Sequence, residues 1–574
     1  MSGLPHRALR AAALACLLSG CALYPPPEGV SQPAEGGIDA VIARFGIAPL
    51  DPGQDPLPQL ARALGQSDPS HRLADVTYSL ETGNRLPRDW LVQTPDAWDM
   101  PAASVPFLPL DCPGCDADFH LPSCEASPCA IGRCAPLAAS VVRAGQRPRR
   151  VCLGQSDALV DRIYGLVAGA ERAVDITMLQ PPADFRFLAA LRNAVTRLAA
   201  SRRPVTLRIM IGDYPPDGTD PKRFLQDLLR DAAATRGSRL TLYVGDIRSC
   251  EGGPCGSLSW NHAKIIAVDG KRALVGGHNQ WTQDYLLDAP VHDLSMQIEG
   301  PAARAAHRFA DALWGFVCSH GQPGSTTESY RYRAGDPEIA PGCLAHLAVP
   351  PAARGPGKVP VLALGRLASG IADDFADQSQ LARTLSFGAA RKTIRMVQQD
   401  IAFALPGALG ISWPDSDIRR MLDLLAKGGD VFLVLSNEGA KSPVGGYSNG
   451  IPIARVGEYF RTLMRRDHEM PEERLTALLC AHLHLAPLRF GPDASWPHDR
   501  PIGVHAKFWM VDDRLFYVGS ENLYPVDLQE FGYALEDPAA AAEIRRDYWD
   551  RLWRWSSRAA ISGADAPRCI FRAE

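Results

Sequence analysis

Hydrophobic and polar positions follow the same order twice along this chain. Each time, a short apolar run typical of a strand precedes a stripe with apolar positions three and four apart, and a second apolar run follows. The first series comprises 174–178, a helix with Leu188, Leu191, Val195 and Leu198 on its apolar face, and 205–211; the second comprises 393–397, a helix with Ile418, Met421, Leu422 and Leu425, and 431–435. The repeated order predicts an α/β fold of two similar half-repeats, each with a mixed β-sheet flanked by helices.

A polar motif follows the last strand of each series. The stretches WNHAKIIAVDGKRALVGGHN and GVHAKFWMVDDRLFYVGSEN both fit the pattern H-x-K-x(4)-D-x(6)-G-[GS]-x-N. The first copy consists of His262, Lys264, Asp269, Gly276, Gly277 and Asn279, and the second of His505, Lys507, Asp512, Gly519, Ser520 and Asn522. A single H-x-K has no significance, but a duplicated pattern of six positions indicates a shared role.

The residue types in this motif suit phosphodiester chemistry. Residues two apart on a strand face the same side, so each histidine projects beside its lysine, and the glycines allow a close backbone approach near the asparagine. Two facing copies supply two imidazoles, two fixed cations and two amides. One histidine can attack phosphorus, the other can protonate the leaving oxygen, and the lysines and asparagines can bind the anionic oxygens. We therefore expect an active site between the half-repeats.

The paired motifs resemble the HKD signatures of the phospholipase D superfamily, and the likeness extends from about residue 151 to about residue 555. The resemblance implies a phosphohistidine intermediate, with His262 as the nucleophile and His505 as the general acid and later the general base. It also implies a carboxylate downstream of each histidine that orients the ring. The candidates are Asp293 for His262 and Glu530 for His505.

The repeat extends beyond the motif, which supports both carboxylate assignments. A proline lies eight positions after each carboxylate, Pro301 and Pro538. A helix with an aromatic-x(3)-Leu-Trp seam follows each proline; the seams are Phe309, Leu313 and Trp314, and Tyr548, Leu552 and Trp553.

The motif residues allow two other roles, a structural role for the aspartates and metal binding. Asp269 and Asp512 are expected to fix the turn after the strand rather than to touch substrate. A zinc site is disfavoured because lysine is a poor ligand and no second His or Cys lies two to four residues from either histidine. We predict no metal and no cofactor.

The N-terminus has the pattern of an exported bacterial lipoprotein. Basic residues precede an apolar run over 11–18, which is too short to span a bilayer and predicts a signal peptide. Leu18-Ser-Gly-Cys21 resembles a lipobox, which implies lipidation at Cys21, and Ala22 favours the outer membrane, facing the periplasm. Ordinary secretion with cleavage nearby is the alternative. A Pro/Gly-rich tether follows.

The cysteine count fits an oxidising compartment. The chain has 14 cysteines, and twelve remain once Cys16 leaves with the signal peptide and Cys21 takes lipid. We predict a structural disulfide framework rather than zinc or redox sites. The short loop favours Cys250–Cys255, elimination gives Cys318–Cys343 and Cys480–Cys569, and the other six cluster at Cys112, Cys115, Cys124, Cys129, Cys134 and Cys152.

Composition and the approach to the site bear on the substrate. The net charge is −4, or about −6 without Arg7 and Arg10, which argues against a nucleic-acid partner. The apolar stretch 401–413 is either a buried connection or an interfacial loop for lipid entry. Aromatic residues are expected to line the approach: Trp260, Trp281, Tyr285, Trp496, Trp509 and Tyr524. A phospholipid is favoured.

Other activities remain open from the sequence. They are phosphatidyl transfer of the cardiolipin-synthase type, a periplasmic nuclease of the same superfamily, and a catalytically silent envelope scaffold. The scaffold is disfavoured because no motif position is degraded. Both motifs lie in one chain, so a monomer suffices for one active site.

These patterns divide the chain into successive segments. They are a signal peptide (1–20), a lipidated tether (21–38), a Cys-rich N-terminal region (39–150), a first half (151–330), a connector (331–358) and a second half (359–560).

Overall fold

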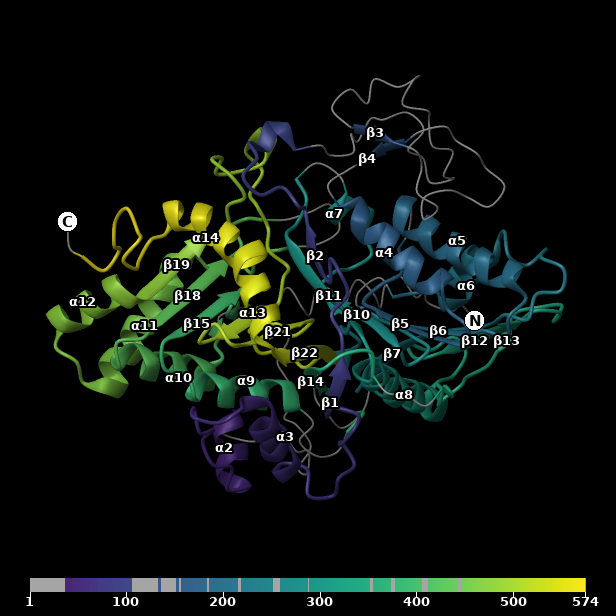
Figure 1. Ribbon diagram of the computed structural model, residues 1–574, viewed down its shortest axis with the longest axis horizontal. Coiled ribbons are helices and arrows are strands. Elements are labelled where there is room, and N and C mark those ends of the chain that lie inside the picture. Colours follow the sequence, from purple (N-terminus) through teal and green to yellow (C-terminus); the bar gives the residue numbers. More distant parts are fainter. Residues whose placement is uncertain are drawn as a thin grey trace, which may run out of the picture.

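The structure is a computed structural model. It describes residues 37–105, 133–135, 151–153, 156–182, 185–214, 218–250, 259–286, 289–350, 355–372, 377–404, 411–440 and 446–572. Two large sheets lie side by side, each with helices on both faces (Figure 1). The predicted α/β architecture with two mixed sheets is confirmed.

The first sheet contains the first motif. Its central strands are β7 (Thr241–Ser249), β6 (Thr206–Gly212), β5 (Ala173–Met178), β9 (Ile265–Val268), β10 (Arg272–Gly276) and β11 (Asp293–Glu299), in this spatial order. The pairs β5–β6 and β6–β7 are parallel, whereas β5–β9, β9–β10 and β10–β11 are antiparallel. The motif therefore forms the antiparallel hairpin β9–β10 beside a parallel core.

The second sheet repeats this order. Its strands β19 (Leu483–Pro487), β18 (Asp430–Leu435), β15 (Thr393–Val397), β20 (Phe508–Val511), β21 (Leu515–Gly519) and β22 (Glu530–Glu536) correspond in order and direction to those of the first sheet. The strand predicted at 393–397 has the same bounds in the structure. The two sheets meet along β10, β11, β21 and β22.

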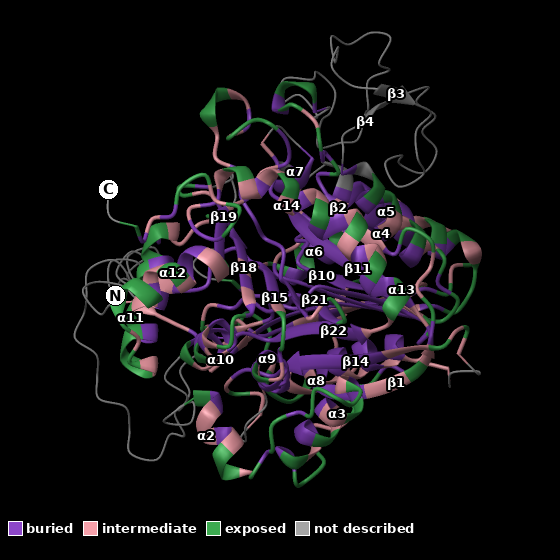
Figure 2. Cartoon of the chain, turned by 60° about the vertical axis from the view of Figure 1, so that its left-hand side comes forward, coloured by how far each residue is buried: buried purple, intermediate pink, exposed green. Residues whose placement is uncertain are grey.

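Helices cover each sheet because the strands carry apolar residues on both faces. On one face lie α4 (Asp157–Ala168), α5 (Phe185–Ser201) and α6 (Pro221–Leu229) of the first half, and α9 (Gln378–Gly388), α10 (Asp415–Ala426), α11 (Ile453–His468) and α12 (Glu472–His482) of the second. On the other face lie α8 (Ala302–His320), α13 (Pro538–Ile544) and α14 (Asp550–Ser556). The most deeply buried residues follow the strands between these layers (Figure 2).

The two seam helices tie the halves together. On α8, Phe309, Leu313 and Trp314 are fully buried, and the Phe309 ring lies 5.1 Å from that of Phe531 on β22. Tyr548 belongs to a π-helical turn (Arg545–Trp549) between α13 and α14, and its hydroxyl lies 3.0 Å from the His292 ring nitrogen of the first half. Each half therefore packs a C-terminal helix against the other half.

The N-terminal region adds to both halves. Strand β1 (Tyr78–Asn84) pairs with β14 (Val359–Arg366), which extends the second sheet beyond β22, and β2 (Leu91–Thr94) pairs with β11 of the first sheet. Helices α2 (Gly37–Arg44) and α3 (Pro56–Gln66) pack in the core of the second half. This segment thus covers a strand edge on each sheet, which would otherwise present unpaired backbone groups.

The predicted connector also has regular structure. Strands β12 (Ser329–Arg333) and β13 (Ala340–Pro341) continue the first sheet beyond β7. Within the described residues, no helix is both long and apolar enough to cross a membrane.

Candidate active site

Both motif histidines lie just before the first strand of their hairpins, where the two halves touch. The backbone N–H of His262 donates to the Gln529 carbonyl (2.9 Å), next to the carboxylate residue of the second half. The His505 N–H donates to the His292 carbonyl (2.7 Å), next to the carboxylate residue of the first half. These reciprocal contacts bring each histidine to the other half's carboxylate.

The carboxylates consequently orient the histidines in crossed pairs. His262 Nδ1 lies 3.0 Å from both carboxylate oxygens of Glu530, and His505 Nδ1 lies 2.8 Å from Asp293 Oδ2. The predicted pairing of Asp293 with His262 and of Glu530 with His505 is therefore wrong. Both carboxylates do orient a catalytic-motif histidine, but each serves the histidine of the other half, because the backbone bridges cross between the halves.

The two imidazole rings face each other. Their centroids are 6.2 Å apart at an interplanar angle of 73°, close enough for one phosphoryl group to contact both. With each Nδ1 against a carboxylate, the Nδ1 carries the proton and Nε2 is left as the reactive nitrogen. The structure thus brings together the two predicted reactive groups and fixes their tautomers.

Burial sets the ionisation of the four central groups. It lowers the pKa of His262 to about 4, although Glu530 opposes this, and it lowers the pKa of His505 to about 3, assisted by the positive charge of Lys507. Both imidazoles are therefore neutral near pH 7. For the carboxylates, burial raises the pKa, but the neighbouring charges outweigh it: the pKa of Glu530 falls to about 2, chiefly through His262, and that of Asp293 falls further, chiefly through His278 and His505.

Both motif lysines are buried beside the histidines. Lys264 Nζ donates to the His262 carbonyl (2.7 Å), and Lys507 Nζ donates to the His505 carbonyl. Burial lowers the pKa of Lys507 to about 8 and that of Lys264 well below its usual value. Each ammonium has three donors, so each retains hydrogen-bonding capacity for an anion.

The motif asparagines present unsatisfied polar atoms. Asn279 and Asn522 are 3% and 2% exposed, and their buried amide atoms Oδ1 of Asn279 and Oδ1 and Nδ2 of Asn522 have no hydrogen-bond partner in the protein. A buried amide without a partner is costly unless a ligand completes it. Of these atoms, only Asn522 Nδ2 is a donor, and it fits the predicted role in binding a phosphoryl oxygen; the two amide oxygens can only accept hydrogen bonds.

The small motif residues allow close packing behind the site. A Cβ on Gly277 would lie 2.1 Å from Asp293 Oδ1, and one on Gly276 would lie 2.1 Å from Ser295 Oγ. A Cβ on Gly519 would lie 2.1 Å from the Tyr517 hydroxyl. At the position equivalent to Gly277, the Ser520 hydroxyl donates to Glu530 Oε2 and thereby fixes this carboxylate.

Asp269 and Asp512 have the predicted structural position. Asp269 accepts the backbone N–H groups of residues 171, 172 and 173 at 2.8–2.9 Å. Asp512 accepts those of residues 391, 392 and 393 at 2.7–2.9 Å. Each aspartate therefore fixes the turn after the motif strand to the start of the half's central strand, β5 or β15.

Two groups behind the site, His278 and Arg366, were not recognised from the sequence, and a third, Tyr285, was predicted only as an aromatic residue of the approach. The Tyr285 hydroxyl donates to Asp293 Oδ2 (2.8 Å), and His278 joins Thr94 Oγ1 (2.7 Å) to Ser295 Oγ (2.6 Å). Arg366 Nη2 lies 3.5 Å from Glu530 Oε1. The alignment of the two motifs offered one signal: position 278 is histidine where the second copy has Glu521, so the two copies differ in charge there.

The predicted aromatic approach is partly wrong. Trp509 is 1% exposed and stacks on Tyr517 in the core of the second half, because the helices cover that face of β20. Trp496 is buried against Phe490. Tyr285 reaches His505 Nδ1 at 3.4 Å, whereas Trp260 and Trp281 are half-buried.

The described ends of the apolar stretch 401–413 pair with each other. Ile401 and Ala402 are 1% exposed, and Phe403–Ala404 (β16) pairs with Ile411–Ser412 (β17). Phe403 stacks on Tyr524 with ring centroids 6.1 Å apart. Residues 405–410 lie outside the described part of the chain, so the interfacial reading stays a prediction.

Two of the predicted disulfides are confirmed, Cys318–Cys343 and Cys480–Cys569. Cys250 is disulfide-bonded, but its predicted partner Cys255 lies outside the described residues. Cys134 and Cys152 are backbone partners in the ladder β3–β4 (Arg133–Ala135 and Val151–Leu153). Cys16, Cys21, Cys112, Cys115, Cys124 and Cys129 also lie outside the described residues.

No group of three or more His, Cys, Asp or Glu side chains with the geometry of a metal site occurs among the described residues.

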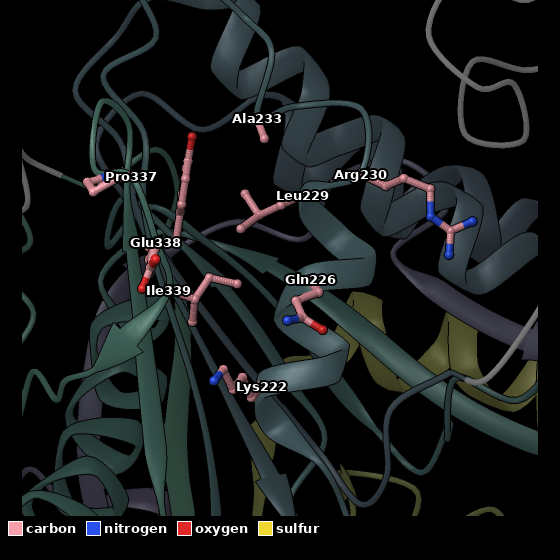
Figure 3. A pocket seen from close by; sticks show the side chains of 9 residues that line it. Lys222, Gln226, Leu229, Arg230, Ala233, Pro337, Glu338 and Ile339 are labelled. Carbon is pink, nitrogen blue, oxygen red and sulfur yellow. The ribbon is translucent and has the colours of Figure 1, made fainter.

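A cavity of about 450 Å³ lies between α6 and the segment after β12. Lys222, Gln226 and Leu229 face Glu338 and Ile339 across it, whereas Arg230 turns away (Figure 3). No motif residue lines this cavity, so it is separate from the histidine site.

Two carboxylate-oriented imidazoles facing each other, with two lysines and two unsatisfied amides around them, define a phosphodiesterase. The sequence comparison agrees with this class. The chain is 30% identical over 453 residues to a phospholipase D of Streptomyces antibioticus, covering 71% of this chain and 79% of the relative. The chain therefore belongs to the phospholipase D family.

Other comparisons add little to this assignment. No model of a protein family matches the chain. A phosphatidylserine synthase of Haemophilus influenzae is similar over 69% of this chain and 83% of its own, with 13% identity and a TM-score of 0.45. A polyphosphate kinase of Porphyromonas gingivalis is similar over 73% of this chain and 50% of its own, with 10% identity and a TM-score of 0.36. Both TM-scores are below 0.5.

Proposed function

We propose that this phosphodiesterase hydrolyses phospholipids to phosphatidic acid and a free head group through a phosphohistidine. The observation that carries the proposal is the pair of facing, carboxylate-oriented imidazoles His262 and His505. The phospholipase D relative and the acidic balance of the chain support a phospholipid rather than a nucleic acid as the substrate.

In the first step, Nε2 of neutral His262 attacks phosphorus and the bond to the head-group oxygen breaks. His505, as imidazolium, gives its Nε2 proton to that oxygen. Burial lowers the pKa of His505, and an anionic phosphodiester between the rings raises it, so that His505 can carry the proton that it donates. Asp293 stabilises the imidazolium through Nδ1.

In the second step, water replaces the head group. Neutral His505 takes a proton from the water, the water oxygen attacks phosphorus, and the bond between phosphorus and His262 breaks. Lys264, Lys507, Asn279 and Asn522 bind the phosphoryl oxygens throughout, because their donors surround the histidines and the developing charge is greatest in the transition state. Apart from the substrate and the attacking water, every group in this scheme is a side chain of the protein, so the scheme uses no metal or cofactor.

A panel assay tests this function. Purified protein is incubated with vesicles of defined head groups and, separately, with single-stranded DNA, and released head group or nucleotide is measured. We expect head-group release that is lost in His262→Ala and His505→Ala. Nucleotide release without head-group release would contradict the lipid substrate, and the appearance of a new phosphatidyl alcohol with added alcohol would show that transfer competes with hydrolysis.

We further propose that Cys21 is lipidated and anchors the enzyme in the bacterial cell envelope, at the outer membrane facing the periplasm. The Leu18-Ser-Gly-Cys21 sequence, the apolar run before it and the Pro-rich tether after it support this. Such an anchor would hold the site near its lipid substrate.

A further inference from the structure

The carboxylates behind the two histidines have different hydrogen-bond and ion-pair partners. Apart from His505 itself, the hydrogen-bond partners of Asp293 are the Tyr285 hydroxyl (2.8 Å) and the backbone N–H of Leu294 (2.8 Å), and both are uncharged. Glu530 accepts from the Ser520 hydroxyl and, in addition, faces the Arg366 guanidinium, with Nη2 at 3.5 Å from Oε1. The half-repeats are therefore alike in their histidines and lysines but unlike in the charge behind them.

Arg366 is held firmly in this position. It lies at the end of β14, its side chain is 9% exposed, and its Nε donates to the Leu528 carbonyl (2.8 Å), two residues before Glu530. Nη1 pairs with Asp377 (3.4 Å) and lies 4.0 Å from Glu521. Glu521 and Asp417 in turn pair with Arg383. A buried charge network thus ends at Glu530 and His262.

One atom of this guanidinium has no hydrogen-bond partner in the protein. Nη2 is buried and, at 3.5 Å, forms an ion pair with Glu530 without a good hydrogen bond. Glu530 Oε1 is shared between this cation and His262 Nδ1, which lies closer at 3.0 Å. The charge of Arg366 therefore acts on His262 through the carboxylate that both of them contact.

We propose that Arg366 is a positioning residue for the reaction: its guanidinium holds Glu530 anionic and fixed against His262, and so sets the proton affinity of this histidine. The proposal rests on the function given above and deepens it. Arg366 acts through Glu530 and does not touch substrate. The first half has no counterpart to this cation among the hydrogen-bond and ion-pair partners described for Asp293.

The direction of the effect follows from the charges around Glu530 and His262. The ionisable groups that face them are Lys264, Lys507, Arg366, His505, Glu521, Tyr517 and Tyr524, and Asp377 and Asp527 face Arg366. Without the guanidinium, the charge of Glu530 would act undiminished on His262, and Glu530 would itself bind a proton more readily. In both cases a proton binds at a higher pH, either on His262 or on Glu530. A proton on either residue disables the attacking histidine.

The test uses Arg366→Gln and Arg366→Lys in the full chain, with Arg208→Gln as the matched control. Arg208 is also buried, with a side chain 0% exposed against 9% for Arg366, and it pairs with Asp175 and Asp311 in the first half but with neither histidine's carboxylate. Imidazole NMR titration, with His262 assigned from the spectrum of His262→Gln, reports its proton binding whether or not the protein turns over substrate. The pH dependence of kcat/KM is measured in parallel.

In Arg366→Gln we expect the His262 titration and the acidic limb of kcat/KM to move up by about one pH unit, with kcat reduced roughly 100-fold. Arg366→Lys retains the charge but not the planar fork, so its acidic limb should stay within about 0.3 unit while kcat falls roughly tenfold. Arg208→Gln should lower the melting temperature without moving either titration.

Three results would overturn the proposal. They are an unmoved His262 titration in Arg366→Gln, an equal shift in Arg208→Gln, or wild-type kcat in Arg366→Lys. The last remains decisive if Arg366→Gln does not fold. A failure of the proposed function would look different: the wild type would release no head group, while the NMR titration would still report on Arg366.

Discussion

The crossed histidine–carboxylate pairs predict that the two carboxylates fail in different ways when neutralised. Asp293→Asn should impair His505, the general acid, whereas Glu530→Gln should impair His262, the nucleophile. Both replacements keep the side-chain size, remove the charge and exchange one acceptor oxygen for an NH2 donor. The two variants therefore separate proton donation from attack.

The magnitude follows from the geometry. The Asp293 carboxylate is fully buried, with Oδ2 2.8 Å from His505 Nδ1. Opposite charges about 4 Å apart interact by about 4 kcal/mol at an effective dielectric constant of about 20. Losing this stabilisation of the imidazolium should lower the rate of the protonation-dependent step by roughly three powers of ten.

The assay compares two phosphodiesters, one with an alkoxide and one with a nitrophenolate leaving group, in single-turnover experiments. Nitrophenolate needs little protonation, so Asp293→Asn should release it within about tenfold of the wild-type rate but lose roughly 10³-fold on the alkyl substrate. Glu530→Gln should lose a similar factor on both. The opposite pattern, with nitrophenolate release retained in Glu530→Gln and lost in Asp293→Asn, would refute the assigned roles.

Three further outcomes follow from the site. Because burial lowers the pKa of Lys507 to about 8, KM should rise as the pH increases through that value and the ammonium loses its charge; a KM that stays flat to pH 10 in the wild type would contradict this. Asp269→Ala removes the acceptor of three backbone N–H groups and should lower the free energy of unfolding by about 3 kcal/mol, visible as a lower urea midpoint, with Asp269→Asn intermediate. EDTA should leave the rate unchanged, since imidazoles and lysines carry the chemistry; loss of activity that a divalent ion restores would favour a metallophosphodiesterase.

Local patterns predicted the elements that carry the site, because those patterns reflect burial on one face. The strand at 393–397, the α8 seam of Phe309, Leu313 and Trp314, and both motif hairpins lie where periodicity placed them. The duplicated spacing also identified the histidines and the two carboxylates.

Contacts between distant segments could not be predicted in the same way. His262 and Glu530 are 268 residues apart, His505 and Asp293 are 212 apart, and the offsets within each repeat favoured the wrong partner for both histidines. The exchange depends on the bridges from Gln529 and His292 across the halves, which have no sequence signature. Strands β1 and β2 were missed because each completes a sheet edge whose partner lies far along the chain.

The most direct test of the account is to identify the residue that carries the covalent intermediate. A radiolabelled phosphodiester with a nitrophenolate leaving group is mixed with enzyme, quenched under alkaline conditions that preserve phosphohistidine, and the label is mapped to a peptide. We predict label on His262 in the wild type and in His505→Ala, and none in His262→Ala. Label on His505 in the wild type would reverse the roles, and substrate turnover in His262→Ala at the wild-type rate would contradict the mechanism altogether.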